Sequence, residues 1–161
     1  MTTRTGIGYD SHRFAIGGPI LLGGVLIPSD YHLAGHSDAD AIAHALTDAV
    51  LGAVAAGDIG EMFPDSDPAN KGRSSIEMLR AAVERIQSLG WRVVACDVTV
   101  IAELPKIGPH REAIRGVLAP ALGVIAGHVS VKGKTNEGMG WIGRGEGLAV
   151  IAVATLAPRG E

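Results

Sequence analysis

Asp10, His12 and His44 carry the side chains with the clearest chemical potential in this sequence. Asp10 and His12 are two residues apart at the end of a predicted strand, so their side chains project from the same face. His44 lies on the polar side of a predicted helix, with Asp40 and Asp48 one turn away on either side. One carboxylate and two imidazoles form a ligand set suited to zinc, with a fourth position open for substrate or water. A flanking aspartate could orient His44 through its other ring nitrogen.

Each of these residues also has a purely structural interpretation. Asp10 could be a turn residue, His12 a surface histidine and His44 a satisfied interior histidine. The segment 36–40, His-Ser-Asp-Ala-Asp, favours a site because it directly precedes a predicted helix. Backbone N–H groups and the positive end of the helix dipole favour an anion there. Capping the helix would need only one of these side chains.

Two other segments have side chains suited to a polar ligand. The turn-rich stretch 58–68 is acidic and could accept hydrogen bonds from hydroxyl groups. The stretch 132–138, followed by Trp141 and the glycine-rich 143–147, offers cations and hydroxyl and amide donors for phosphates. The second stretch matches neither a Walker A loop nor a dinucleotide fingerprint. Glu137 could bind a hard cation.

The elements that must position these residues follow from the apolar pattern. Residues 38–56 have helical periodicity, Ser74 and Ser75 can cap a second helix that ends at Leu89, and 109–122 predicts a third. Strands are predicted at 3–10, 20–27, 92–103, 129–135 and 147–156. The sequence therefore predicts an α+β fold, with helices packed on one face of a mixed four- to five-stranded sheet.

The last predicted strand indicates that the chain associates with itself. Residues 148–154 are apolar on both faces of the strand, but only three helices are predicted, enough to cover one face of the sheet. Another copy of the same chain is the simplest cover for the second face, so we expect a homo-oligomer.

Composition limits the classes of protein that remain. The chain has 161 residues, of which 47% are apolar and 19% charged, which is typical of one globular domain spanning 1–161. Its 14 basic and 17 acidic residues give a net charge of −3, which argues against a nucleic-acid or membrane partner. No apolar stretch is long enough to span a bilayer. With one cysteine, Cys96, expected to be buried, and no targeting pattern, we expect a cytoplasmic protein.

Taken together, these motifs resemble the 2-C-methyl-D-erythritol 2,4-cyclodiphosphate synthase family, from end to end of the chain. The resemblance rests on 8–14 (Gly-Tyr-Asp-Ser-His-Arg-Phe), 36–40, 44–49 (His-Ala-Leu-Thr-Asp-Ala), 58–60, 63–68 (Phe-Pro-Asp-Ser-Asp-Pro), Pro105-Lys106, 134–137 (Lys-Thr-Asn-Glu) and 143–147 (Gly-Arg-Gly-Glu-Gly). It implies a homotrimer built around its sheets, with active sites at the subunit interfaces. It also implies a phosphorus–oxygen lyase of the non-mevalonate isoprenoid pathway. In that reaction the 2-phosphate of 4-diphosphocytidyl-2-C-methyl-D-erythritol 2-phosphate attacks the β-phosphorus and expels CMP.

The resemblance also implies roles for individual residues. Asp10, His12 and His44 correspond to zinc ligands, and Glu137 to the ligand of a second divalent cation, Mg²⁺ or Mn²⁺. His36 and Thr135 correspond to residues that stabilise the transition state. The implied substrate contacts are Asp10, Ser11, His12, His36, Ser37, Asp58, Ile59, Gly60, Phe63, Pro64, Asp65, Ser66, Asp67, Ala102, Glu103, Leu104, Pro105, Lys106, Ile107, Gly108, Lys134, Thr135, Asn136, Glu137, Trp141 and Arg144. The stretch 102–108 resembles a cytidine pocket that a neighbouring subunit contributes.

Three alternatives remain open at the level of sequence. Arg144 and Glu146 could pair between subunits instead of contacting substrate. The same zinc ligands could activate water in a phosphohydrolase. Zinc could also merely stabilise a trimeric binding module, which would require a closed four-ligand site.

Overall fold

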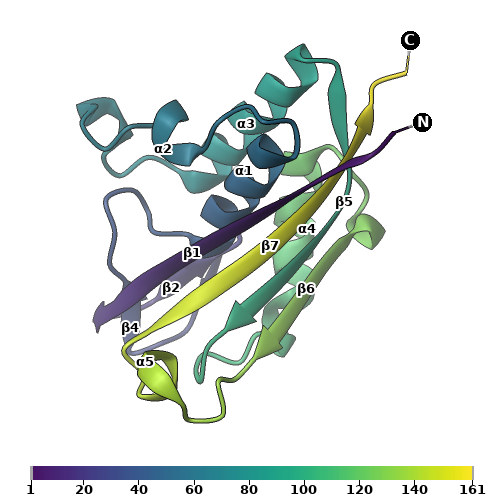
Figure 1. The fold of residues 1–161 in the computed structure, drawn as a ribbon. Coiled ribbons are helices and arrows are strands. Elements are labelled where there is room, and N and C mark those ends of the chain that lie inside the picture. The colour runs from purple at the N-terminus through teal and green to yellow at the C-terminus, as the bar shows by residue number, and fades with distance from the viewer. Residues whose placement is uncertain (1, 161) are drawn as a thin grey trace.

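The computed structural model describes residues 2–160, which form a twisted five-stranded sheet with its helices on one side (Figure 1). The strand order is β4-β1-β7-β5-β6. All neighbouring strands are antiparallel except β5 and β6, which are parallel. The strands are β1 (Arg4–Ile16), β4 (Tyr31–Leu33), β5 (Trp91–Ile101), β6 (Val129–Lys134) and β7 (Gly147–Pro158). The α+β class and the mixed sheet predicted from the sequence are confirmed.

Three long helices pack behind this sheet in Figure 1: α1 (Ala41–Ala53), α3 (Ser75–Ser88) and α4 (Arg111–Leu122). The helix termini follow local capping chemistry, because Asp40 caps α1 and Ser74 caps α3. The shorter elements are the hairpin β2 (Ile20–Leu22) and β3 (Val25–Ile27), the helical turns α2 (Ile59–Met62) and α5 (Gly140–Gly143), and the 3₁₀ turns η1 (Pro68–Asn70), η2 (Gly108–His110) and η3 (Ala126–His128).

The structure corrects three of the predicted elements. The first strand does not end near residue 10 but runs to Ile16, because β7 and β4 continue to pair with its polar second half. The predicted strand 20–27 is a hairpin, since Gly23 and Gly24 both adopt positive φ and turn the chain back. The strand predicted at 92–103 is β5, Trp91–Ile101, and a bulge around Val94 interrupts its alternation, so that Val93 and Cys96 are both buried.

The core lies between the helices and the face of the sheet that the helices cover, and the even-numbered residues of β7 point to this face. Leu148, Val150 and Ala152 point into it and are fully buried. Cys96 of β5 is also buried there, as the sequence predicts.

The opposite face of the sheet is covered by no element of the described chain. Ile7 and Tyr9 of β1 expose 70% and 56% of their surface on this face, and Ile151 of β7 exposes 37%. These residues are neighbours, since Tyr9 is paired with Ile151. A contiguous apolar patch of this kind is typical of an interaction surface.

Among residues 2–160, no helix has the length and apolar character needed to cross a membrane.

Candidate active site

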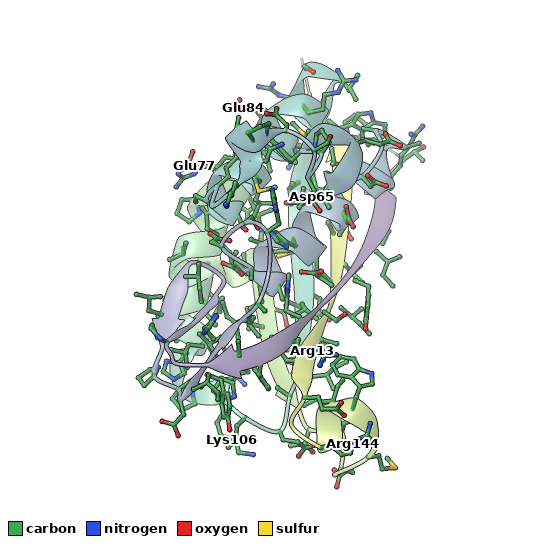
Figure 2. The ribbon with its side chains drawn as sticks, turned by 90° about the vertical axis from the view of Figure 1, so that its left-hand side faces the viewer. Arg13, Asp65, Glu77, Glu84, Lys106 and Arg144 are labelled. Carbon is green, nitrogen blue, oxygen red and sulfur yellow. The ribbon has the colours of Figure 1, made fainter. Side chains whose placement is uncertain are left out.

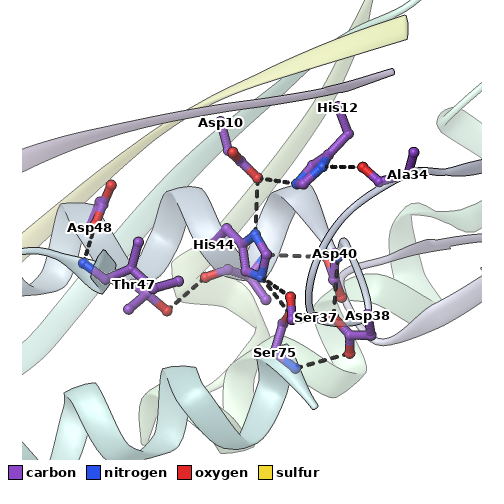
Figure 3. Close-up of polar contacts among 12 residues, drawn as sticks. Asp10, His12, Ala34, Ser37, Asp38, Asp40, His44, Thr47, Asp48 and Ser75 are labelled. Carbon is purple, nitrogen blue, oxygen red and sulfur yellow. Dashed lines mark hydrogen bonds and ion pairs between the residues drawn. The ribbon is translucent and has the colours of Figure 1, made fainter. Parts of the chain in front are cut away.

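Asp10, His12 and His44 converge as the sequence predicts (Figure 3). The Oδ2 atom of Asp10 lies 2.8 Å from Nε2 of His12 and 3.1 Å from Nδ1 of His44. Asp10 and His12 come from the same face of β1, and His44 comes from α1, which packs directly beneath that strand. Their ligand atoms all lie within 4.8 Å of one another, which is close enough to hold one metal ion.

The position of the proton on the His12 ring favours a cation between His12 and Asp10. Its Nδ1–H donates a hydrogen bond of 2.8 Å to the carbonyl oxygen of Ala34. In the neutral ring Nε2 then carries a lone pair. This buried nitrogen makes no hydrogen bond, although it faces the Asp10 carboxylate. A lone pair directed at a carboxylate oxygen is stabilised by a cation placed between them, so the residues present fit a metal ion.

The pKa shifts of Asp10 and His12 have the same electrostatic cause. Burial alone would raise the pKa of Asp10, but its interactions with the imidazoles of His12 and His44 outweigh this effect and hold that pKa below its ordinary value. Burial alone would lower the pKa of His12, but Asp10 outweighs it and raises that pKa. Positive charge is therefore favoured between these side chains, whether a proton or a metal ion carries it.

The flanking aspartates do not orient His44, contrary to the sequence-based hypothesis. Asp40 is fully buried at the N-terminus of α1 and accepts hydrogen bonds from the backbone N–H groups of Gly23, Gly24 and Ala43. Asp48 accepts one from the backbone N–H of Ile59. Both carboxylates thus hold loops against α1.

Two hydroxyl groups face the second ring nitrogen of His44 instead. Its Nε2 atom lies 2.7 Å from Oγ of Ser75 and 2.9 Å from Oγ of Ser37. The Ser75 hydroxyl in turn donates to the carboxylate of Asp38 (Figure 3). Sequence reasoning identified Ser75 only as a possible helix cap, because its 31-residue separation from His44 leaves no local signal.

A cavity of about 260 Å³ opens beside this cluster, and His12 and His44 line it. The other residues expected to touch substrate that line it are His36, Ser37, Ile59, Gly60, Phe63 and Asp65. Asp58 adjoins it and caps α2 by accepting from the Glu61 N–H. Pro64, Ser66 and Asp67 are exposed on the following loop. The cavity therefore leaves the Asp10–His12–His44 cluster open on the side of His12 and His44.

The remaining predicted substrate contacts lie elsewhere on the chain. Seven of them line a second cavity of about 270 Å³ between the β5–α4 loop and the end of β6: Ala102, Pro105, Lys106, Ile107, Gly108, Lys134 and Thr135. Figure 2 shows Lys106 at the lower end of the molecule and Asp65, which lines the first cavity, in the upper half. The two cavities have no lining residue in common.

The other predicted contacts are divided between the two regions. Glu103, Leu104 and Arg144 line a larger cavity of about 560 Å³ together with Pro105 and Lys106. Ser11 and Trp141 line a smaller one beside His12. Asn136 and Glu137 lie on the loop after β6, so Glu137 is not part of the three-ligand cluster.

Arg144 forms an ion pair with Glu146 within the chain. Its Nε–H donates a 2.8 Å hydrogen bond to Glu146 of the same chain. Both side chains are exposed at the turn before β7, in line with a weak surface ion pair.

Comparison with known proteins places this arrangement in a family. The model of the YgbB family matches residues 3–157. The chain belongs to the YgbB family. A 2-C-methyl-D-erythritol 2,4-cyclodiphosphate synthase of Gemmatimonas aurantiaca is 66% identical over 98% of this chain and 95% of its own length. Another from Bordetella petrii is 50% identical over 96% of this chain and 95% of its own length.

Solved structures agree with this YgbB-family assignment. The structure titled as a CDP complex of IspF from Plasmodium falciparum has a TM-score of 0.86 at 34% identity, covering 98% of this chain and 97% of that one. The bifunctional IspDF of Campylobacter jejuni has a TM-score of 0.93 at 39% identity, covering 98% of this chain and 42% of that one. The sequence-based identification of the family, and of the chain as a cyclising lyase, is confirmed.

Proposed function

We propose that this YgbB-family chain converts 4-diphosphocytidyl-2-C-methyl-D-erythritol 2-phosphate into 2-C-methyl-D-erythritol 2,4-cyclodiphosphate and CMP. The observation that carries this proposal is the Asp10–His12–His44 cluster beside an open cavity, in a chain 66% identical to a protein named for this product. In the reaction a 2-phosphate oxygen forms a bond to the β-phosphorus, and the bond from that phosphorus to the CMP oxygen breaks. The departing CMP takes the electron pair of that bond, and no water is consumed.

We propose that the cluster Asp10, His12 and His44 holds zinc and that Glu137 holds a second cation, Mg²⁺ or Mn²⁺. The three-ligand set is that of an open zinc site, and a lone carboxylate with bound phosphates suits a hard cation. When bound, these ions supply positive charge that offsets the charge developing on the phosphate oxygens.

The chain's own side chains then position the substrate. His36 and Ser37 line the cavity beside the cluster, where His36 can stabilise the transition state and Ser37 can donate a hydrogen bond to the methylerythritol phosphate end. Asp58, already fixed as the α2 cap, can accept from a substrate hydroxyl. At the second cavity, Thr135 can donate to the diphosphate, and the 102–108 loop can enclose the cytidine.

We propose that the complete site forms between subunits of a homotrimer. The two groups of substrate contacts line separate cavities of one chain, so a neighbouring copy can supply the missing half. The exposed patch of Ile7, Tyr9 and Ile151 supports this association, because burying it removes apolar surface from water.

Phosphorus NMR tests the proposed reaction directly. Purified protein is incubated with the cytidine diphosphate substrate, zinc and Mg²⁺, alongside His12→Ala and the control His32→Ala, an exposed histidine on β4. Cyclic diphosphate and CMP are expected from the parent and from His32→Ala only. Inorganic phosphate as product would indicate a zinc phosphohydrolase, and unchanged substrate with zinc bound would indicate a binding module. Either of these results would overturn the proposal.

Mixing two inactive variants tests whether the site is shared. His12→Ala lacks one half of the proposed site, and Thr135→Ala impairs the other half. After joint unfolding and reassembly in equal amounts, about one quarter of the sites should combine two intact halves, and activity should return to that extent. A mixture as inactive as its parents, with mixed trimers verified by mass spectrometry, would show that one chain builds the whole site.

A further inference from the structure

The environment of His44 assigns a task to two residues outside the proposed substrate contacts, Ser75 and Asp38. His44 has Asp10 at one ring nitrogen and the hydroxyl of Ser75 at the other, 2.7 Å away (Figure 3). Ser75 is fully buried at the start of α3. Its hydroxyl is not needed to cap that helix, because Ser74 is the capping residue.

Asp38 fixes where the Ser75 hydroxyl points. One carboxylate oxygen accepts from the Ser75 hydroxyl, and the other accepts a 2.9 Å hydrogen bond from the Ser75 backbone N–H. The backbone N–H of Asp40 adds a third contact to the same carboxylate at 3.2 Å. A hydroxyl group has a single proton. Because the Ser75 hydroxyl donates that proton to Asp38, its Oγ can only accept a hydrogen bond from His44.

This arrangement determines which nitrogen of His44 carries the proton. A lone pair on Ser75 Oγ accepts from Nε2–H, so Nδ1 is left unprotonated. Nδ1 is the atom that faces Asp10, at 3.1 Å. Two unprotonated imidazole nitrogens, Nε2 of His12 and Nδ1 of His44, then point toward one carboxylate oxygen, which is the arrangement a metal ion requires.

We propose that Ser75 and Asp38 are positioning residues that hold His44 in its metal-binding tautomer and orientation. The proposal rests on the proposed zinc site and deepens it, since neither residue touches the substrate cavity or the metal. Without Ser75, Nε2 loses its oriented acceptor and keeps only the Ser37 hydroxyl, 2.9 Å away, which can rotate to donate or to accept. Without Asp38, the Ser75 hydroxyl is free to turn and donate to Nε2, which favours the tautomer that protonates Nδ1 and blocks the metal.

Zinc affinity, measured by competition with a chromophoric chelator, is the first readout. Ser75→Ala and Asp38→Ala should each weaken zinc binding about 10- to 100-fold, the usual effect of removing a partner of a metal-bound histidine. The matched control is Ser74→Ala, which removes a hydroxyl from the adjacent residue and a helix cap but no contact with His44. Its zinc affinity should stay within about threefold of wild type.

The double variant Ser75→Ala with Asp38→Ala separates a linked pair from two independent effects. Because Asp38 acts through Ser75, the double variant should bind zinc about as weakly as whichever single variant has the lower zinc affinity. If its fold-loss in zinc affinity equals the product of the two single fold-losses, the two residues act independently and the proposed linkage is overturned. Wild-type affinity in Ser75→Ala would overturn the proposal itself.

A spectroscopic readout on the wild-type protein does not depend on whether the variants fold. In zinc-loaded protein labelled with ¹⁵N-histidine, the His44 Nε2–H should be visible and slow to exchange with water. A fast-exchanging Nε2–H would overturn the proposal. If wild-type protein fails to bind zinc, the proposed metal site fails, which is distinguishable from failure of the positioning pair alone.

Discussion

Gly8 of β1 lies directly against the backbone of Ala45 in α1, so that any side chain at position 8 would overlap the Ala45 carbonyl oxygen. Gly6 makes the same close approach one turn further along the helix, at Ala49. Asp10 is two residues beyond Gly8 on the same face of β1, and His44 immediately precedes Ala45. The contact between these two backbones therefore sets the distance between the Asp10 carboxylate and the His44 ring.

We predict that Gly8→Ala destabilises the fold by about 3 kcal/mol, because strand and helix must separate to admit a methyl group. Urea unfolding followed by circular dichroism measures the loss. Zinc affinity should fall as well, because Asp10 moves away from His44. The control is Gly116→Ala in α4, where a methyl group meets open space and should stabilise the helix by up to about 1 kcal/mol. Equal stability of Gly8→Ala and wild type would contradict the packing described here.

Local periodicity predicts which faces carry Asp10, His12 and His44. Period-two spacing puts Asp10 and His12 on one side of a strand, and helical spacing puts His44 on the polar side of α1. The hydrogen-bond partners of the two histidines could not be predicted in the same way. Ser75 and the Ala34 carbonyl reach the histidines through tertiary packing, over separations of 31 and 22 residues.

Helical spacing alone gave a wrong prediction for two aspartates, because a carboxylate can accept either from a histidine ring or from backbone N–H groups. Asp40 and Asp48 have helical spacing from His44, but their carboxylates are used by backbone N–H groups from distant loops. A buried backbone donor must find an acceptor, and the sequence does not indicate which distant loop will supply it. The sequence also did not predict that β1 continues beyond Asp10. That polar half has no apolar alternation and is held in the sheet by its pairing with β7 and β4.

Replacing Asp40 should test how strongly its carboxylate holds the β2–β3 hairpin to α1. Asp40→Ala leaves the N–H groups of Gly23, Gly24 and Ala43 without their acceptor, and the expected cost is about 3 kcal/mol of unfolding free energy. Ser74→Ala, which removes the longer cap contact of 3.4 Å on α3, should cost about 1 kcal/mol or less. Similar losses in the two variants, measured by urea unfolding, would refute the special role of Asp40.

Asp97 should give the chain an acid-sensitive increment of stability. Its hydrogen bond with Lys132, at 2.7 Å between β5 and β6, is the main cause that lowers the pKa of Asp97. A lowered folded-state pKa means that this stabilisation is present above the ordinary pKa of 3.8 and is lost as pH falls through the lowered value. The pair is half-exposed, so its contribution at neutral pH should be about 1 kcal/mol or less. The difference in unfolding free energy between wild type and Asp97→Asn should shrink toward zero in this acid range. A difference that grows as the pH falls would contradict the assignment.

Cys96 should be inert in the folded protein. Burial, with a smaller contribution from the charge of Asp97, raises the pKa of its thiol to about 12, and the thiolate is the reactive form. At pH 8 iodoacetamide should therefore label Cys96 only after unfolding, which mass spectrometry detects. Rapid labelling of native protein would show that the β5 face of the core opens readily to solvent.

Glu103 should determine how well the loop after β6 presents Glu137. Its Oε1 atom accepts hydrogen bonds from the backbone N–H groups of Asn136, at 3.0 Å, and Gly138, at 3.2 Å, so it holds the residues on both sides of Glu137. Glu137 itself adopts a left-handed φ of 52°, a conformation that a loose loop would readily leave. With Glu137 in its proposed role as ligand of the second cation, Glu103→Ala should raise the Mg²⁺ concentration for half-maximal activity about 10-fold, the usual effect of removing support from a metal ligand. Glu103→Gln keeps an acceptor oxygen and should stay within about threefold of wild type. The surface variant Glu112→Ala, which removes only an ion pair on α4, serves as the control. If Glu103→Ala retains the wild-type Mg²⁺ dependence, the loop holds Glu137 in place without this carboxylate.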